Sequence, residues 1–411
     1  MAVTHAQFDL VIIGGGLVGH ALLAALKPLY GQSARVALLE STAEPDNHNS
    51  IGFSPAFDDR STAISAGSIQ LLQKWNLWPG LRDYAEEIRH IQISEQSGPA
   101  TAELHAEDQQ PALGCVINNH ALGSALLTQS RQLPVTLKFN TEVEALQFFP
   151  EYVQLQTSQE SITARLVIVA EGGRSELKAR LGFQDDKLDF HQHAIIANIA
   201  HKKPHQNWAF ERFSSAGPMA MLPLSNQQSA QQRPVSALVW SVPEAEVDAL
   251  VALPKPAFIT QIQQHFGGRL GQFTDISERF SYPLVRTYTA EQVRSRLVLL
   301  GNSAVSLHPV AGQGLNLALR AVSSLAQILN TLPLAQLGQL SPLLQYQRSI
   351  QADQQLVMNF CDKLVQGFEL PGLKLVRACG LGMLDRHTLA KELFSRYAMG
   401  LAGSQLHEHR V

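Results

Sequence analysis

The chain has 411 residues, a formal net charge of −3, 45% hydrophobic residues and 16% charged residues. At roughly 100–200 residues per domain, this length predicts two or three structural units, and the apolar content excludes wholesale disorder. No strongly basic stripe occurs, so nucleic acid is not an expected partner. Cys115, Cys361 and Cys379 are too widely spaced for a metal site or a disulfide framework, so we expect inert thiols and no bound metal.

The first residues carry no basic run of the kind that opens a signal peptide. No window approaches the roughly 20 consecutive apolar residues that span a bilayer. We therefore expect a cytoplasmic protein whose contact with membranes, if it has any, is peripheral.

A strand–helix–strand pattern opens the chain. Residues 10–13 are an apolar run that ends in glycines, a helical pattern follows from about Leu17 to Leu26 and is closed by Pro28, and residues 36–39 form the next apolar run. This order predicts a parallel sheet covered on both faces. Leu23 stands where a smaller residue would pack closer to the sheet.

The glycines of this pattern fit the G-x-G-x-x-G spacing. Gly14 permits the tight turn, Gly16 lets the backbone approach a pyrophosphate, and Gly19 lets the helix pack close to the strand. Glu40 follows the second strand, where an acid binds ribose hydroxyls. Strand, turn, helix, strand and acid together predict a dinucleotide site.

Two later apolar runs also end in glycine loops. Residues 166–170 lead into Glu171-Gly172-Gly173, and residues 297–300 lead into Gly301-Asn302. Ligands of open α/β sheets collect at such strand ends. We therefore expect one discontinuous cofactor domain made of residues 1–85, 112–184 and 287–340.

The segment after Asn302 combines a rigid His308-Pro309 pair, the glycines Gly312 and Gly314, and a helix that begins near Leu315. The N-terminus of that helix offers donors to an anionic or electron-rich partner. By contrast, Asp59-Arg60-Ser61-Thr62 predicts by itself only an acidic loop and then a helix capped by Ser61 or Thr62.

Short strand-like segments separated by polar breaks predict a largely antiparallel sheet: Ala194–Ala200, Trp208–Phe213, Met219–Leu224 and Val235–Val242, with a hairpin loop at Asn226–Arg233. We expect residues 86–111 and 185–286 to form a substrate domain. Residues 341–411 are expected to form a C-terminal helical region that serves as a lid, an oligomer contact or a membrane-surface element.

Together these motifs resemble the class A flavoprotein aromatic hydroxylases, and within them the ubiquinone-biosynthesis hydroxylases of the 2-polyprenyl-6-methoxyphenol branch. The resemblance rests on Gly14–Gly19, Asp59–Ala63, Phe210–Phe213 with Gly217–Pro223, and Gly301–Asn316. It implies an α/β fold, α+β overall, with a Rossmann-like FAD-binding domain, an inserted antiparallel-sheet substrate domain and a C-terminal helical region.

The resemblance also implies site residues. Gly14, Gly16 and Gly19 would line the FAD pyrophosphate, with Glu40 at the adenosine ribose and Arg60 beside the flavin. Glu171 and Gly172 would serve FAD and NADPH, and Asn302 the ribityl chain. Pro309, Gly312, Gln313, Gly314, Leu315 and Asn316 would frame the isoalloxazine ring. The sequence departs from the family at Glu171, a longer acid than the usual Asp, and at Ala321, where the branch typically has Asp.

The implied activity is an FAD-dependent, NADPH-using monooxygenase that transfers oxygen from O₂ to a polyprenylated phenol. No catalytic base is identified, and His308 is a weak candidate because a histidine before proline often makes only local hydrogen bonds. Three alternatives stay open: hydroxylation of another ring position, a flavin oxidase or dehydrogenase of a small metabolite, and a low-activity subunit of a quinone-synthesis complex. The ring position, tail length, oligomeric state and membership of a multiprotein complex are not fixed by the sequence.

Overall fold

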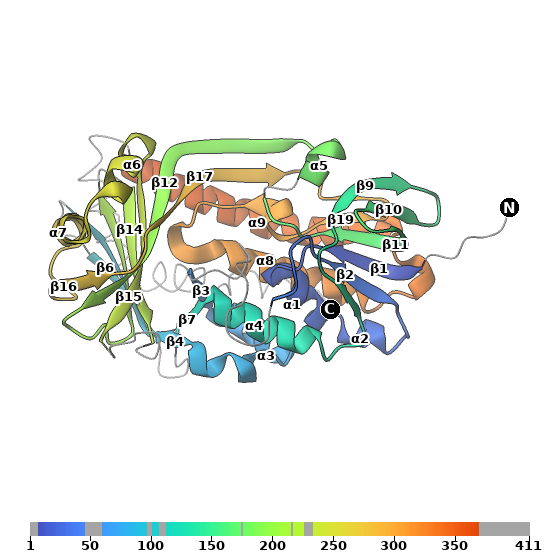
Figure 1. Ribbon diagram of the computed structural model, residues 1–411, viewed down its shortest axis with the longest axis horizontal. Helices are drawn as coiled ribbons and strands as arrows, with labels where there is room; N and C mark the ends of the chain where they lie inside the picture. Colours follow the sequence, from blue (N-terminus) through green and yellow to red (C-terminus); the bar gives the residue numbers. More distant parts are fainter. Residues whose placement is uncertain are drawn as a thin grey trace.

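A computed structural model describes residues 7–45, 60–96, 101–106, 112–173, 176–214, 217–225 and 233–369. Its described residues form three sheets, with an eight-stranded sheet at one end of the long axis and a nine-stranded sheet at the other (Figure 1). Asp59, Cys379, nearly all of the predicted hairpin loop at Asn226–Arg233 and the predicted C-terminal region beyond residue 369 lie outside the described residues.

The eight-stranded sheet joins segments that are far apart in the sequence. Its central strands run in the order β18-β19-β11-β1-β2-β8, and β10 and β9 extend from β11. The strands are β1 (Phe8–Ile13), β2 (Val36–Leu39), β8 (Thr136–Lys138), β9 (Val143–Phe148), β10 (Val153–Thr157), β11 (Ser161–Val169), β18 (Val293–Arg294) and β19 (Leu297–Leu299). The pairs of β1 with β2 and β11, of β11 with β19, and of β2 with β8 are parallel. The prediction of a parallel sheet from three separated pieces is confirmed.

Burial on both faces explains why β1 is apolar at nearly every position. Leu10 and Ile12 belong to one hydrophobic core, whereas Val11 and Ile13 belong to another on the opposite face. The helices that surround the two cores are α1 (Leu17–Ala25), α2 (Lys27–Tyr30), α3 (Ala66–Lys74), α4 (Asn119–Ser130), α5 (Glu176–Arg180), α8 (Gln313–Leu329) and α9 (Leu340–Glu369). Leu23 is fully buried among them, so the larger side chain is accommodated.

Pro28 does not end the first helix. The helix α1 ends at Ala25, and Pro28 lies in the first turn of α2, where its missing N–H costs nothing.

The nine-stranded sheet is antiparallel except where β13 pairs with β5. Its strands are β5 (His90–Glu95), β6 (Thr101–His105), β12 (Asp185–His201), β13 (Trp208–Ser214), β14 (Gly217–Leu224), β15 (Val235–Pro243), β16 (Phe273–Ile276), β17 (Phe280–Thr289) and β20 (Val305–Ser306). Strands β12 and β17 run along the top of the molecule between the two ends (Figure 1). The antiparallel sheet is confirmed, and the domain boundaries stay a prediction.

One face of this sheet is covered by α6 (Glu244–Ala252) and α7 (Lys255–Phe266), which pack on a core that includes Trp240 and Met221. The other face, called here the inner face, is turned toward the eight-stranded sheet (Figure 1). Val310 of the predicted flavin loop shares a hydrophobic core with Phe213 and Ile93 of this face.

The segment after Arg60 is a strand rather than a capped helix. Strand β3 (Ser61–Ser65) forms a small sheet with β7 (Gly114–Asn118) and β4 (Glu86–Ile88). The helix α3 begins only at Ala66, and its cap is Ser65, whose Oγ accepts from Ser68 N–H at 3.3 Å. The prediction that Ser61 or Thr62 caps a helix is therefore wrong, because pairing with β7 keeps these residues extended.

Candidate flavin and substrate site

The turn after β1 is glycine-rich because the protein's own backbone fills the space around it. Gly14 has φ +110°, and a Cβ there would lie 2.6 Å from backbone atoms of Ala170. A Cβ on Gly19 would lie 2.1 Å from the carbonyl oxygen of Gly14. These two glycines let α1 begin directly against the ends of β1 and β11.

The first turn of α1 has no side-chain cap. Its N-cap is Gly16, in extended conformation, and no side chain accepts from the N–H groups of that turn. Uncapped N–H groups together with the helix dipole suit an anionic phosphate. His20 lies buried in α1, with Nδ1 2.9 Å from Ser130 Oγ, and burial lowers its pKa to about 4, so it is neutral near pH 7.

Glu40 lies where the sequence predicts it, at the end of β2. One carboxylate oxygen accepts from Gly15 N–H at 2.6 Å, and the other accepts from both N–H and Oγ1 of Thr42 at 2.9 Å. The acid is thus held beside the glycine turn, and it is only half-buried.

The other two strand ends meet at the same edge of the sheet. Ser303 Oγ donates to the carbonyl of Gly172 at 3.1 Å, and a Cβ on Gly301 would touch Val18 of α1 at 3.0 Å. Buried Lys178 holds this junction, because its Nζ donates to the Ser303 carbonyl at 3.2 Å and pairs with Asp185 at 2.7 Å. Glu171, Gly172 and Asn302 therefore lie next to the first glycine turn. No sequence pattern predicted the roles of Ser303 and Lys178.

The loop before α8 forms a tight turn. Val310–Gly312 is a 3-10 turn (η5), in which Gly312 N–H donates to the Pro309 carbonyl at 2.9 Å and Gly312 has φ +59°. The helix α8 begins at Gln313, close to the predicted start at Leu315, and no side chain caps it.

The side chain of Asn316 fastens this turn to β3. Its Nδ2 donates to the carbonyls of Gly312 at 2.8 Å and Ala63 at 3.0 Å, and its Oδ1 accepts from Ser65 N–H at 2.9 Å. The side chain is buried and makes three hydrogen bonds. The family resemblance placed Asn316 at the flavin ring and did not predict these side-chain hydrogen bonds.

Arg60 links the three-stranded sheet to the nine-stranded sheet. It directly precedes β3, and its guanidinium lies over the ring of Tyr282 on β17, 4.7 Å from the centroid. The half-buried cation is thereby placed between the cofactor turn and the inner face of the nine-stranded sheet.

His308 has a structural environment. Its Nδ1 accepts from Val310 N–H at 3.1 Å, and its ring lies edge-on to Phe190. Burial lowers its pKa to about 4, and Nδ1 is already engaged as an acceptor. These contacts support a role in shaping the loop and argue against His308 as a proton acceptor.

The residues present fit a bound dinucleotide with a flavin ring. Among the described residues, no atom lies within 4 Å of a Cβ built on Gly314 or on Gly172. The two positions leave open space at the first turn of α8 and at the end of β11, respectively. At Gly19 the fold leaves no space for a Cβ, so it requires glycine there. At Gly172 and Gly314 the fold leaves such space.

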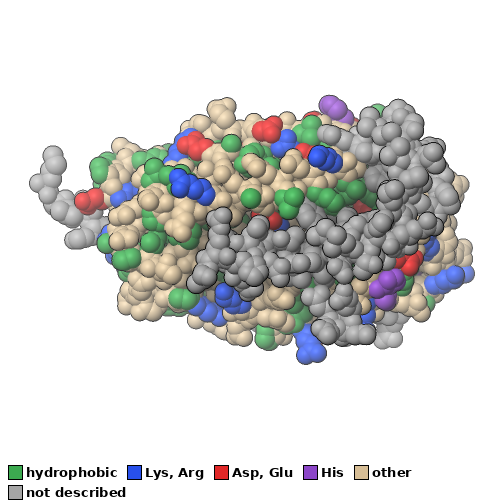
Figure 2. Space-filling view, turned by 180° about the vertical axis from the view of Figure 1, so that it is seen from behind, with side chains coloured by type: hydrophobic (Ala, Val, Ile, Leu, Met, Phe, Trp, Pro, Cys, Tyr) green, Lys and Arg blue, Asp and Glu red, His purple; other side chains and the backbone are tan. Residues whose placement is uncertain are grey.

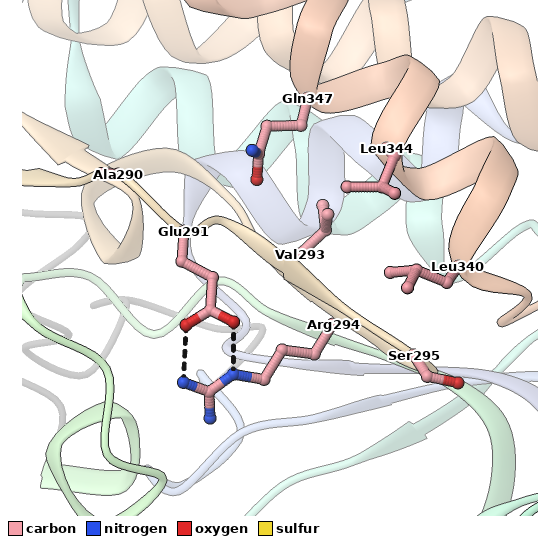
Figure 3. Close-up of a pocket in the computed structure, with 8 residues that line it drawn as sticks. All are labelled: Ala290, Glu291, Val293, Arg294, Ser295, Leu340, Leu344 and Gln347. Atoms are coloured by element: carbon pink, nitrogen blue, oxygen red, sulfur yellow. Dashed lines mark hydrogen bonds and ion pairs between the residues drawn. The ribbon is translucent and has the colours of Figure 1, made fainter.

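One depression of the described surface lies away from this site. It has a volume of about 540 Å³ and is lined by Ala290, Glu291, Val293, Arg294, Ser295, Leu340, Leu344 and Gln347. Figure 3 shows that Glu291 and Arg294 bind each other through two contacts, so neither charge points to a ligand. This depression contains none of the predicted site residues.

The described cysteines, and Ala321 where the sequence departs from the family, lie in the protein interior. Cys115 and Cys361 are buried, and burial raises the pKa of both thiols to about 12. Ala321 is buried beside Tyr346 and Gln354, where a cavity of about 10 Å³ remains. Among the residues that Figure 2 colours by type, basic and acidic side chains are interspersed over the surface.

Comparison with known proteins agrees with this geometry. A family model described as an FAD binding domain matches residues 7–360. The chain is 32% identical to ubiquinone hydroxylase UbiL of Rhodospirillum rubrum, covering 95% of the chain and 89% of that protein. It is 28% identical to 3-demethoxyubiquinol 3-hydroxylase of Escherichia coli, covering 97% and 100%. The fold is similar to that of p-nitrophenol 4-monooxygenase PnpA from Pseudomonas putida, with a TM-score of 0.76, 17% identity and 98% of each chain covered.

The chain belongs to the FAD-binding family of flavin-dependent aromatic monooxygenases. None of the described helices is long and apolar enough to cross a membrane.

Proposed function

We propose that this protein is an FAD-dependent, NADPH-using monooxygenase that hydroxylates a polyprenylated phenol, 2-polyprenyl-6-methoxyphenol, in ubiquinone biosynthesis. The observation that carries the proposal is the placement of an apolar inner sheet face opposite the uncapped turn of α8. Val310, Phe213 and Ile93 pack in one core across this junction. The ubiquinone hydroxylases among the relatives support the substrate class.

The chain's residues have separate tasks in this proposal. The turn at Gly14, Gly16 and Gly19 binds the pyrophosphate, and Glu40 binds the adenosine ribose. Glu171, Gly172 and Asn302 line the middle of the cofactor. These residues surround the strand ends that the structure brings together.

The flavin ring would lie at the turn formed by Pro309, Gly312, Gln313, Gly314, Leu315 and Asn316. When bound, FAD supplies the redox chemistry between NADPH, O₂ and the phenol. The N–H groups of the first turn of α8 stabilise negative charge on the ring because they are fixed in place before the reaction. Arg60 adds a positive charge on the same side.

The apolar residues of the inner face exclude water and receive the prenyl tail. Exclusion of water favours oxygen transfer over loss of reducing equivalents to solvent. Ile196, Val239 and Leu222 are each partly exposed on this face, as expected for a wall that contacts a ligand.

The test uses purified protein and a 2-methoxyphenol with a short prenyl chain. The proposal predicts a yellow flavin spectrum, NADPH oxidation that depends on the phenol, and a product heavier by one oxygen atom derived from labelled O₂. NADPH oxidation that ignores the phenol would instead indicate an oxidase. Protein that neither holds nor can be reconstituted with flavin would support the alternative of a structural subunit.

The ring position is tested in cells. Deletion of the gene followed by mass spectrometry should show accumulation of 2-polyprenyl-6-methoxyphenol. Accumulation of a later precursor would assign the protein to another hydroxylation of the same pathway.

A further inference from the structure

One ionisable side chain lies in an otherwise apolar row of the inner face. Hydrogen-bonded register aligns six residues across six strands: Phe280, Ile196, Val239, Ala220, Glu211 and Ile93. Residues paired in register point to the same face of a sheet. Glu211 on β13 is the single charged residue of this row.

The flanking residues of β13 confirm which face Glu211 uses. Ala209 and Phe213, two positions before and after it, are 4% and 1% exposed and pack toward the interior. Arg212 points to the other face, where its Nε donates to the His265 carbonyl at 2.8 Å. The Glu211 carboxyl is therefore directed into the space between the two sheets.

Within the described part of the chain, Glu211 has no ion-pair or hydrogen-bond partner. Desolvation raises the pKa of its carboxyl to about 7, although the residue as a whole is partly exposed. A carboxyl without a partner on a largely apolar face is costly, and such groups mark candidate functional sites.

The other ionisable groups on the elements around Glu211 are occupied or neutral. On α9, Cys361 is a buried thiol whose pKa is raised partly by Glu211, and Asp362 pairs with Arg286 at 3.2 Å. On β5, Glu95 lies one row away beside Phe213 and has its own partner.

Glu211 also lies near the flavin loop. Phe213, which flanks Glu211 on the same face, shares a hydrophobic core with Cys361 and with Val310 at the start of η5, and Cys361 Sγ is 3.9 Å from the Val310 carbonyl.

We propose that Glu211 is a catalytic residue that binds the hydroxyl of the phenol substrate and accepts its proton. This inference rests on the proposed function. The O–H bond breaks, its electron pair stays on the phenol oxygen, and the proton bonds to a carboxylate oxygen of Glu211. The resulting phenolate pushes electron density into the ring positions ortho and para to it, where oxygen is added.

The complete reaction balances without any further reactant. NADPH and a proton supply two electrons and two hydrogens, one atom of O₂ enters the ring, and the other leaves as water. The hydrogen that the ring carbon gives up as a proton and the proton held by Glu211 end on the two hydroxyl oxygens of the product. A phenol with a pKa of about 10 gives its proton more readily to a carboxylate of pKa about 7 than to one of about 4.5.

The experiment compares Glu211→Gln and Glu211→Asp with wild-type holoenzyme, using the same short-chain prenylated 2-methoxyphenol. Glu211→Gln keeps the size and hydrogen bonding of the side chain but cannot take a proton, so kcat/KM should fall by roughly 10²-fold. Glu211→Asp should retain part of the activity. In the wild type, kcat/KM should rise with pH and level off above about 7, because the unprotonated carboxylate is the active form. Glu211→Gln should lack this inflection.

A second readout is independent of turnover. The dissociation constant of the phenol should fall in the wild type as the pH rises through about 7, because the carboxylate accepts a hydrogen bond from the phenol hydroxyl. It should stay constant over the same pH range in Glu211→Gln. Bound flavin content should be the same in both. The matched control is Glu244→Gln, an exposed carboxylate of α6 on the other side of the sheet, which should change nothing.

The outcomes separate the two proposals. Wild-type protein that hydroxylates no phenol would overturn the proposed function, and the role of Glu211 with it. Active wild type with an equally active Glu211→Gln that keeps the same pH profile and the same pH dependence of phenol binding would overturn only the role of Glu211.

Discussion

Two glycine turns open helices in this protein, and they need glycine for different reasons. At the turn before α1, a Cβ on Gly19 would lie 2.1 Å from the Gly14 carbonyl oxygen. At the turn before α8, a Cβ on Gly314 would meet no described atom within 4 Å. The first turn is closed by the protein itself, whereas the second leaves open space among the described residues.

The difference shows that the two turns of this dinucleotide fold have separate functions. Gly14 and Gly19 bring a helix against strands, and the phosphate site follows from that packing. Gly314 does not contribute to the packing. The side chain of Asn316 holds the second turn against β3 through its hydrogen bonds. We expect substitutions of the glycines at the first turn to damage the fold, and substitution of Gly314 at the second turn to damage cofactor binding.

The largest effect is expected at the closed turn. Gly19→Ala should lower the free energy of unfolding by about 3 kcal/mol or more, because a methyl group overlaps backbone that cannot move without separating α1 from β1. Chemical denaturation of the protein without flavin measures this directly. A Gly19→Ala protein as stable as the wild type would contradict the comparison.

The fastening of the second turn should rank next. Asn316→Ala leaves the Ser65 N–H and the Ala63 carbonyl buried without this partner, so we expect a loss of about 2–4 kcal/mol. Asn330→Ala is the matched control, since that side chain makes one hydrogen bond, to the Ala25 carbonyl at 3.0 Å, and should cost about 1 kcal/mol or less. Equal losses in the two variants would show that Asn316 does not fasten the loop.

A smaller effect of opposite sign is expected at Glu211. Its pKa is about 7 when folded and near 4.5 when unfolded, so the unfolded chain loses this proton first and the folded state loses stability as pH rises between these values. Glu211→Gln removes that cost, so it should be more stable than wild type by about 1–3 kcal/mol above pH 7. The two proteins should be equal below about pH 4.

Denaturation curves measured across this pH range test the sign. Glu244→Gln should follow the wild type throughout, because its carboxylate is exposed. A Glu211→Gln variant that is less stable than wild type above pH 7 would mean that the carboxylate has a stabilising partner.

The sequence was sufficient for features that depend on local pattern. Continuous apolar runs predicted β1, β2, β11 and β19, because strands buried on both faces carry no alternation. Alternating short segments likewise predicted the antiparallel sheet. Residues 61–65 were misread because their strand conformation comes from pairing with β7, some fifty residues away, and not from local propensity.

The chemistry of the inner face depended on register that the sequence does not display. Phe210–Phe213 contributed to the family resemblance, yet Glu211 was not predicted as a site residue. A signal was present, since Ala209 and Phe213 at period two place Glu211 on an apolar face. Its significance emerged only when β5, β14 and α9 were known to enclose it.

The smallest change in stability is expected for Gly314→Ala, and this variant tests where the cofactor binds. Gly314→Ala places a methyl group in open space within the first turn of α8, and alanine is the better helix former. Without flavin, we expect the variant to be as stable as the wild type or more stable by about 0.5–1 kcal/mol.

Binding of FAD should show the opposite response, because the methyl group occupies space that the ring needs. We expect the dissociation constant for FAD to rise at least about tenfold, or roughly 1.4 kcal/mol, measured by titration of the flavin-free protein. Gly268→Ala is the control, since it also adds a methyl group in open space but lies at an exposed turn after α7. Unchanged FAD affinity in Gly314→Ala would place the ring away from α8, and the open space at this turn would then have to belong to the phenol.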